Sequence, residues 1–170
     1  IDPRHPFPFI QNKGQGLLIE MANHQKKAQK VVILLPLNTP RFIAVPAENN
    51  RAQDALKFVP AETAIMAFLD KIYPDFNVKQ SGMFRLLRDS DVEIDDEAAD
   101  LVSQFETALR KRRRGNVVSL IISDGLSKSS RNFLKTQFNL SETQIFVSSG
   151  LVGAGDLSEI VSRLPSALLY

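Results

Sequence analysis

The segment from Asp95 to Arg114 constrains the fold more than any other part of the chain. Its apolar residues recur every three or four positions, so they form one stripe along an α-helix. They are Ala98, Leu101, Val102, Phe105, Ala108 and Leu109. The acidic start and basic end both suit the helix dipole, and Gly115 tolerates the left-handed conformation of a C-terminal cap. We therefore predict a helix here whose apolar stripe packs on the rest of the domain.

Short apolar runs predict β-strands along much of the remaining chain. These runs cover residues 16–22, 30–36, 41–45, 78–89, 117–122 and 144–148. The first two are predicted to pair as an antiparallel hairpin with a long polar tip. The third is flanked by Pro40 and Pro46. That setting is typical of an edge strand, where missing backbone donors are tolerated.

Three further helices are predicted from their start signals and apolar spacing. Pro60 suits the start of a helix over residues 61–73, whose predicted inward stripe is Ala64, Ile65, Phe68, Leu69 and Ile72. Ser127 is a favourable N-cap for a helix that continues to about residue 138. A short helix over residues 156–164 completes the set.

The order of these elements predicts an α+β fold. Strands come first and are followed by an alternation of helices and strands, which favours a mixed, mostly antiparallel sheet covered by helices. The proline-rich start, residues 1–9, is expected to be extended rather than helical. No internal repeat or low-complexity linker divides the sequence, so we predict a single domain over residues 1–170.

Composition excludes several classes of protein. With 44% hydrophobic and 24% charged residues, the chain is typical of a soluble globular domain. The absence of cysteine excludes disulfides and thiolate metal sites, and it is compatible with a reducing cytoplasm. No apolar run approaches the roughly 20 residues of a transmembrane helix. Because the sequence opens at Ile1 without an initiator methionine, we expect it to be excised from a longer protein.

No motif in the sequence nominates a catalytic, cofactor-binding or metal-binding residue. The glycines of residues 150–155 follow the order GxxGxG, which is not the dinucleotide fingerprint, so a flexible connector is predicted. The acidic stretch 89–95 lacks the glycine and the final glutamate of a calcium loop. His5 and His24 lie in proline-rich or polar contexts and are predicted to be exposed to solvent.

The strongest charge cluster is the basic run at the end of the predicted helix 95–114. It consists of Arg110, Lys111, Arg112, Arg113 and Arg114. One interpretation is contact with a polyanion, because lysine and arginine neutralise phosphates. The other, which we favour, is a solvated helix end whose charges suit the dipole. No aromatic residues are interleaved for base stacking, so nucleic acid is not an expected partner.

Several longer stretches of the sequence resemble a known family. They are Ile1–Phe9 (IDPRHPFPF), Pro40–Pro46 (PRFIAVP), Phe84–Glu93 (FRLLRDSDVE) and Leu109–Arg113 (LRKRR), the last followed by Gly115 and a valine-rich strand. In this order and spacing they are similar to the middle domain of bacterial polyphosphate kinase. The resemblance covers essentially the whole chain.

This resemblance implies a function for a parent enzyme and a supporting role for this chain. Polyphosphate kinases reversibly transfer the terminal phosphate of ATP to polyphosphate with Mg²⁺. They form a phosphohistidine in a later part that this chain lacks. ATP and Mg²⁺ are therefore implied for the parent, and no cofactor is implied for the fragment, which is expected to be inactive. The parent is expected to be cytoplasmic, with association with the inner membrane as an alternative.

The resemblance also implies partners. The middle domain of the family is chiefly associated with dimer formation, so a non-catalytic structural and dimerisation domain is the leading hypothesis. Its partners would be the remaining domains and a second copy. The candidate dimer surfaces are the apolar lead-in with Phe7 and Phe9 and the tail Leu168–Tyr170, although we favour the alternative that both pack on the remaining domains. The alternative is a polyphosphate- or polyanion-binding module that uses residues 110–114. A small phosphatase or transferase would instead need a histidine beside an arginine at a strand end.

Overall fold

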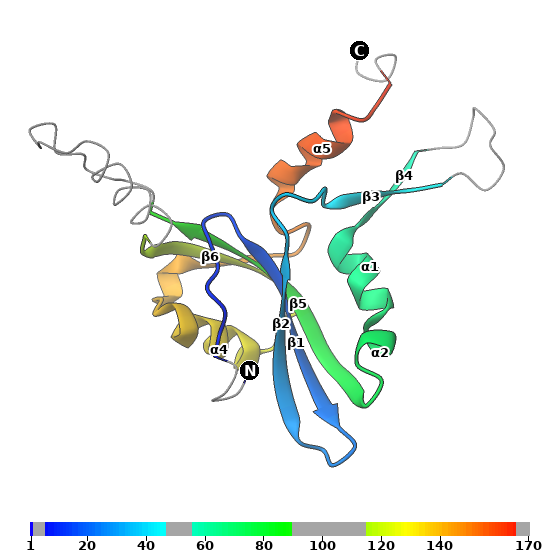
Figure 1. Ribbon diagram of the computed structural model, residues 1–170. Coiled ribbons are helices and arrows are strands. Elements are labelled where there is room, and N and C mark those ends of the chain that lie inside the picture. Colours follow the sequence, from blue (N-terminus) through cyan, green and yellow to red (C-terminus); the bar gives the residue numbers. More distant parts are fainter. Residues whose placement is uncertain (2–5, 47–55, 90–114, 166–170) are drawn as a thin grey trace, which may run out of the picture.

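The computed structural model describes residues 1, 6–46, 56–89 and 115–165, and its fold is α+β (Figure 1). The predicted helix 95–114 lies outside the described residues. The strands are β1 (Gln15–Asn23), β2 (Ala28–Leu35), β3 (Phe42–Val45), β4 (Lys57–Pro60), β5 (Phe76–Arg88), β6 (Val117–Ser123) and β7 (Ile145–Ser148). The helices are α1 (Ala61–Ala67), α2 (Leu69–Ile72), α4 (Lys128–Phe138) and α5 (Ser158–Val161), with 3-10 turns η1 (Glu142–Gln144) and η2 (Ala154–Leu157).

The main sheet has five strands in the order β2-β1-β5-β6-β7. Strand β1 pairs antiparallel with both β2 and β5, and β5 pairs antiparallel with β6. Strands β6 and β7 are parallel, which requires a crossover, and α4 lies between them in the sequence. The prediction of a mixed, mostly antiparallel sheet is therefore confirmed, as is the β1–β2 hairpin.

One face of the sheet is closed by α4 (Figure 1). Because side chains alternate along a strand, this face receives every second residue of the central strands. The buried residues of this cluster are Ile10, Leu18, Phe84, Leu86, Leu120, Ile122, Leu126, Leu134 and Leu140. Phe7 packs on α4 through Phe133 and Phe138, with ring centroids 5.8 and 5.2 Å apart. Of the two candidate surfaces, Phe7 therefore packs on this domain's own core, Phe9 is 57% exposed, and the tail Leu168–Tyr170 lies outside the described residues.

The opposite face is covered by α1, α2 and the loop before η2. Its buried residues are Leu17, Ile19, Met21, Leu69, Met83 and Val152. The predicted helix 61–73 is present but breaks at Phe68, where the backbone leaves helical geometry. The break shifts the phase of the second turn, so Leu69 is buried whereas Phe68 and Ile72 are 52% and 50% exposed. The predicted inward position of Leu69 is therefore confirmed, whereas those of Phe68 and Ile72 are wrong.

A two-stranded ribbon of β3 and β4 forms a separate small sheet. Phe42 pairs with Pro60 at one end and Val45 with Lys57 at the other. The sequence pattern predicts β3, but it predicts residues 58–60 only as the segment that precedes α1. Strand β4 was missed because four residues that end in proline carry a weak strand signal, and the pairing comes from a distant segment.

Candidate functional site

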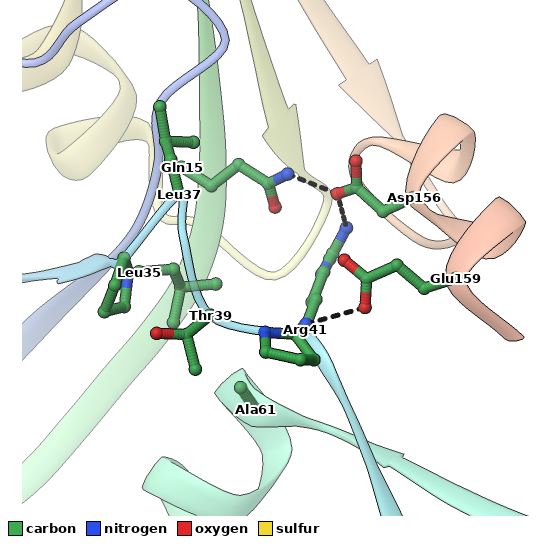
Figure 2. Close-up of a pocket in the computed structure, with 10 residues that line it drawn as sticks. Gln15, Leu35, Leu37, Thr39, Arg41, Ala61, Asp156 and Glu159 are labelled. Atoms are coloured by element: carbon green, nitrogen blue, oxygen red, sulfur yellow. Dashed lines mark hydrogen bonds and ion pairs between the residues drawn. The ribbon is translucent and has the colours of Figure 1, made fainter. Parts of the chain in front are cut away.

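The site residues nominated by the sequence, Arg110, Lys111, Arg112, Arg113 and Arg114, lie outside the described residues. Within the part of the chain that the structure describes, charged side chains gather around Arg41 (Figure 2). Arg41 directly precedes β3, and it is only 6% exposed. A buried guanidinium is costly unless its donors are paired, so its partners decide what the cluster does.

Glu62, in the first turn of α1, is the first partner of Arg41. The Nε atom of Arg41 donates to Glu62 Oε1 at 3.1 Å and to Oε2 at 3.2 Å, and Nη2 also donates to Oε1. Glu62 is itself only 7% exposed. This fork joins the start of β3 to α1 by a buried, charge-assisted pair.

The loop before α5 provides the second set of partners. Nη1 of Arg41 donates to Val152 O at 2.6 Å and to Asp156 Oδ2 at 2.9 Å. Asp156 also accepts from Arg85 Nη1 at 3.4 Å and from Gln15 Nε2. Arg41 and Asp156 thus tie β1, β5, the β3 segment and the C-terminal segment together.

Glu159 of α5 and Arg163, just after this helix, bind backbone groups at the start of β3. The Oε2 atom of Glu159 accepts from Arg41 N at 2.8 Å and from Phe42 N at 3.3 Å. Arg163 Nη1 donates to Phe42 O at 2.7 Å. Because an open strand edge otherwise exposes unpaired backbone groups, these contacts cover the first residue of β3 without a further strand.

The middle of the glycine-rich loop 150–155 contacts this cluster. Gly153 has a φ of +80°, which favours glycine, and an added Cβ would lie 2.2 Å from Arg85 Nη1. Val152 is 2% exposed, and its carbonyl accepts from Arg41. The segment thus connects β7 to the C-terminal helix, as predicted from its glycines, and its middle residues pack on the cluster through Arg41 and Arg85.

Electrostatics keep both members of the Arg41–Asp156 pair charged. Burial by itself lowers the pKa of Arg41, but hydrogen bonds and charge from Glu62 and Asp156 outweigh it, and the pKa is raised. Burial likewise acts to raise the pKa of Asp156, yet Gln15, Arg41 and Arg85 together hold that pKa below its ordinary value. The cluster is a set of mutually satisfied charges at neutral pH.

A small cavity opens beside this cluster (Figure 2). Its volume is about 90 Å³. Its walls are Gln15, Leu35, Pro36, Leu37, Thr39, Pro40, Arg41, Ala61, Asp156 and Glu159. An apolar groove of about 330 Å³ shares Gln15, Leu35 and Leu37 with it and is further lined by Phe9 and Leu34.

Arg88 has a structural position at the other end of β5. Its Nε donates to Ile10 O at 2.8 Å and its Nη1 to Gly115 O at 2.7 Å. The guanidinium also lies 4.7 Å from the centre of the Phe9 ring. Burial lowers the pKa of Arg88. This arginine therefore holds the N-terminal segment and the start of β6 against the sheet.

The described residues hold no group of three or more histidine, aspartate or glutamate side chains placed to bind a metal ion. The prediction that His24 is exposed is confirmed, whereas His5 lies outside the described residues. Among the helices of the described segments, none has the length and hydropathy to cross a bilayer.

Sequence reasoning missed the Arg41 cluster because its members are remote from one another. Glu62 lies 21 residues from Arg41, and Asp156 lies 115 residues from it. The available signal was a polar residue at the border of an apolar strand: Arg41 before β3 and Gln15 at the start of β1. Such positions show that a partner is needed, but they do not say which one.

Comparison with known proteins agrees with this fold. A family model described as the polyphosphate kinase middle domain matches residues 1–160. A polyphosphate kinase of Erythrobacter litoralis is 38% identical over 163 residues, which are 96% of this chain and 22% of that protein. One of Mycolicibacterium gilvum is 30% identical over 164 residues, which are 95% of this chain and 22% of that protein.

A solved structure shows the same fold. The crystal structure of polyphosphate kinase from Porphyromonas gingivalis aligns with a TM-score of 0.68 at 15% identity, covering 98% of this chain and 22% of that chain. The chain thus spans about a fifth of the length of the relatives that it matches. By the family model that covers most of its residues, this chain belongs to the family of polyphosphate kinase middle domains.

Proposed function

We propose that this chain is a non-catalytic structural and dimerisation domain of a polyphosphate kinase. The parent enzyme would reversibly transfer the terminal phosphate of ATP to polyphosphate, with ATP and Mg²⁺ bound by other domains. The observation that supports this proposal is that three arginines, Arg41, Arg85 and Arg88, all donate hydrogen bonds to groups of the same domain.

Phosphoryl transfer needs a different arrangement. Catalysis depends on cations that face the transferred phosphate, a metal ion and an aligned nucleophile. Here Arg41 is held by two carboxylates and two backbone carbonyls, and Arg88 by two backbone carbonyls. These arginines support the packing of segments, which is what a structural domain requires.

The non-catalytic part of the proposal is tested with γ-labelled ATP. The full 170-residue chain is incubated with the label, Mg²⁺ and polyphosphate, and both protein labelling and polymer length are measured. We expect neither to change. Acid-labile labelling of the protein that is lost on replacing His24 or His5 with glutamine would contradict the proposal.

Dimerisation is tested by sedimentation equilibrium over a wide concentration range. Apolar side chains exposed on two strands offer contact area: Ile43 and Val45 on β3, and Phe146 and Val147 on β7. A stable dimer buries about 1,200–2,000 Å² in total, so we expect a weak, concentration-dependent dimer from one such surface. Ile43→Glu or Phe146→Glu should weaken it. A strict monomer at the highest concentration would show that this chain does not dimerise alone.

The alternative function is polyphosphate binding by residues 110–114, supported by five adjacent basic residues. Contacts to phosphates release counterions, so binding should weaken steeply as salt is raised. Replacing Arg112, Arg113 and Arg114 with alanine should then flatten the salt dependence. Equal binding by this triple variant and the parent sequence would exclude the alternative.

A further inference from the structure

The cavity beside Arg41 contains a buried acceptor without a donor. Gln15 is 6% exposed and lines this cavity. Its Nε2 donates to Asp156, but its Oε1 is buried and accepts no hydrogen bond within the described residues. Figure 2 shows this oxygen turned away from Asp156, into the space that the drawn side chains surround. A buried acceptor in this state favours a ligand that donates hydrogen bonds.

The charges around the cavity point to the sign of that ligand. Arg41 is balanced by Glu62, and Asp156 is flanked by Arg41 and Arg85. Glu159 is different, because its carboxylate makes no ion pair within the described residues and only its Oε2 accepts backbone hydrogen bonds. The walls therefore carry an unbalanced negative charge and spare acceptors, which disfavours a phosphate and favours a cation.

The adjoining groove adds an apolar surface. Phe9, Leu34 and Leu37 line it, and they are 57%, 38% and 47% exposed. Leu37 and Gln15 line both the groove and the cavity. A ligand that reached Gln15 with a charged end could therefore lay a short carbon chain along Leu37.

We propose that this composite site binds a primary ammonium group carried on an apolar chain. An ammonium group has three donors and no acceptor, which matches Gln15 Oε1 together with the carboxylate of Glu159, since Asp156 already accepts from Arg41, Arg85 and Gln15. A divalent metal ion fits less well, because the described residues hold no set of three metal-ligating side chains here. The carbon chain gains apolar contact with Leu37 and Phe9.

The same chemistry is offered by a small alkylamine and by a lysine side chain of a partner segment. n-Hexylamine represents the first, and a short uncharged peptide with one lysine between leucines represents the second. Binding of both, with the peptide tighter, identifies a partner lysine. Binding of hexylamine alone identifies a small amine. Binding of neither overturns the proposal.

The probe is titrated into the full 170-residue chain and followed by calorimetry and by the ¹H–¹⁵N signals of side-chain amides. We expect hexylamine to shift the Gln15 amide and to bind about tenfold more tightly than n-hexanol, which lacks the charge. Leu37→Ala should weaken hexylamine but leave methylamine unchanged.

Two carboxylate variants make the test specific. Glu159→Gln retains an oxygen for the β3 amides but loses the charge, and it should weaken hexylamine about tenfold. Glu142→Gln removes a carboxylate outside the cavity, on a side chain that is 76% exposed, and it should change nothing. Equal affinity for hexanol, no effect of Glu159→Gln, or an unmoved Gln15 signal would mean that the cavity holds only an ordered water.

Discussion

The two faces of the sheet are covered through different kinds of interaction. On the α4 face, packing is almost entirely apolar: Phe84, Leu120, Ile122 and Leu134 are each 0% exposed. The opposite face also has an apolar centre, but its border is held by the buried Arg41 and its carboxylate partners. The first face is covered mainly by α4, which follows β6 in the sequence, together with Phe7 and Ile10 of the N-terminal segment. The second is covered by segments that converge from distant parts of the chain.

This difference shows what apolar burial and buried ion pairs each contribute to the fold. Apolar burial is nondirectional and rewards any close packing, so a helix that follows its strand can supply it. A buried ion pair stabilises the fold only when both partners are in place. Removing one partner leaves the other as an unpaired charge that is shielded from water. The Arg41 cluster therefore specifies how the ribbon, α1 and α5 are placed, at the risk of a large loss when one member is removed.

The largest expected effect comes from breaking the charged side. Arg41→Met leaves Glu62 and Asp156 without their main partner, so it should lower the free energy of unfolding by about 3–5 kcal/mol. Urea denaturation at pH 7 measures the loss. The control is Arg163→Met, which removes an exposed arginine with one hydrogen bond to Phe42 O and should cost about 1 kcal/mol. Equal effects of the two variants would contradict the account.

A substitution in the apolar core of the α4 face should lower the free energy of unfolding slightly less. Leu134→Ala deletes buried methyl groups between α4 and the sheet, and such changes cost about 2–5 kcal/mol. Leu157→Ala makes the same chemical change at a side chain that is 43% exposed, and it should stay within about 0.5 kcal/mol. An unchanged urea midpoint for Leu134→Ala would show that α4 does not close this face as described.

The stability contributed by the charged face should depend on pH through Asp156. Because the pKa of Asp156 in the folded state is lowered from 3.8, its stabilising effect is fully present above that value and is lost as pH falls through the lowered pKa. Asp156→Asn should therefore cost about 1–3 kcal/mol at pH 7 and progressively less at pH values below 3.8. Unfolding curves of both proteins across this range test it, and a constant difference would exclude this role of Asp156.

The smallest effect is expected at the start of α4. The Ser127 side chain accepts from Ser130 N at 3.0 Å, so Ser127→Ala should cost about 1 kcal/mol. Ser127→Asp keeps an acceptor at the cap and should retain most of the stability, although Glu20 lies nearby. Thermal unfolding of the two variants measures the difference, and equal losses would show that the cap is not responsible.

The sequence predicted the α4 face better than the other. The strand over residues 117–122, the cap at Ser127 and the inward Leu134 all follow from local signals, and the structure confirms each. Local signals suffice there because the strand and its helix are neighbours in the chain. The general α+β class and the β1–β2 hairpin were also predictable for this reason.

The opposite face depends on contacts that no local pattern records. Residues as far apart as Arg41 and Glu159 meet there, with 118 positions between their numbers. The break at Phe68 also exposes Phe68 and Ile72 of the predicted stripe, and no glycine or proline marks it. Sequence patterns could indicate that Arg41 needs a partner, but only the tertiary structure identifies Glu62 and Asp156.

The most direct test of the account is a double-mutant cycle between Arg41 and Glu62. Arg41→Met, Glu62→Met and the double variant are compared with the original chain by urea denaturation at pH 7. If the two residues form the buried pair that holds α1 to β3, the double variant should be more stable than additivity predicts by about 2–3 kcal/mol. Additive losses, within about 0.5 kcal/mol, would show that the pair is not coupled and would contradict the account of this face.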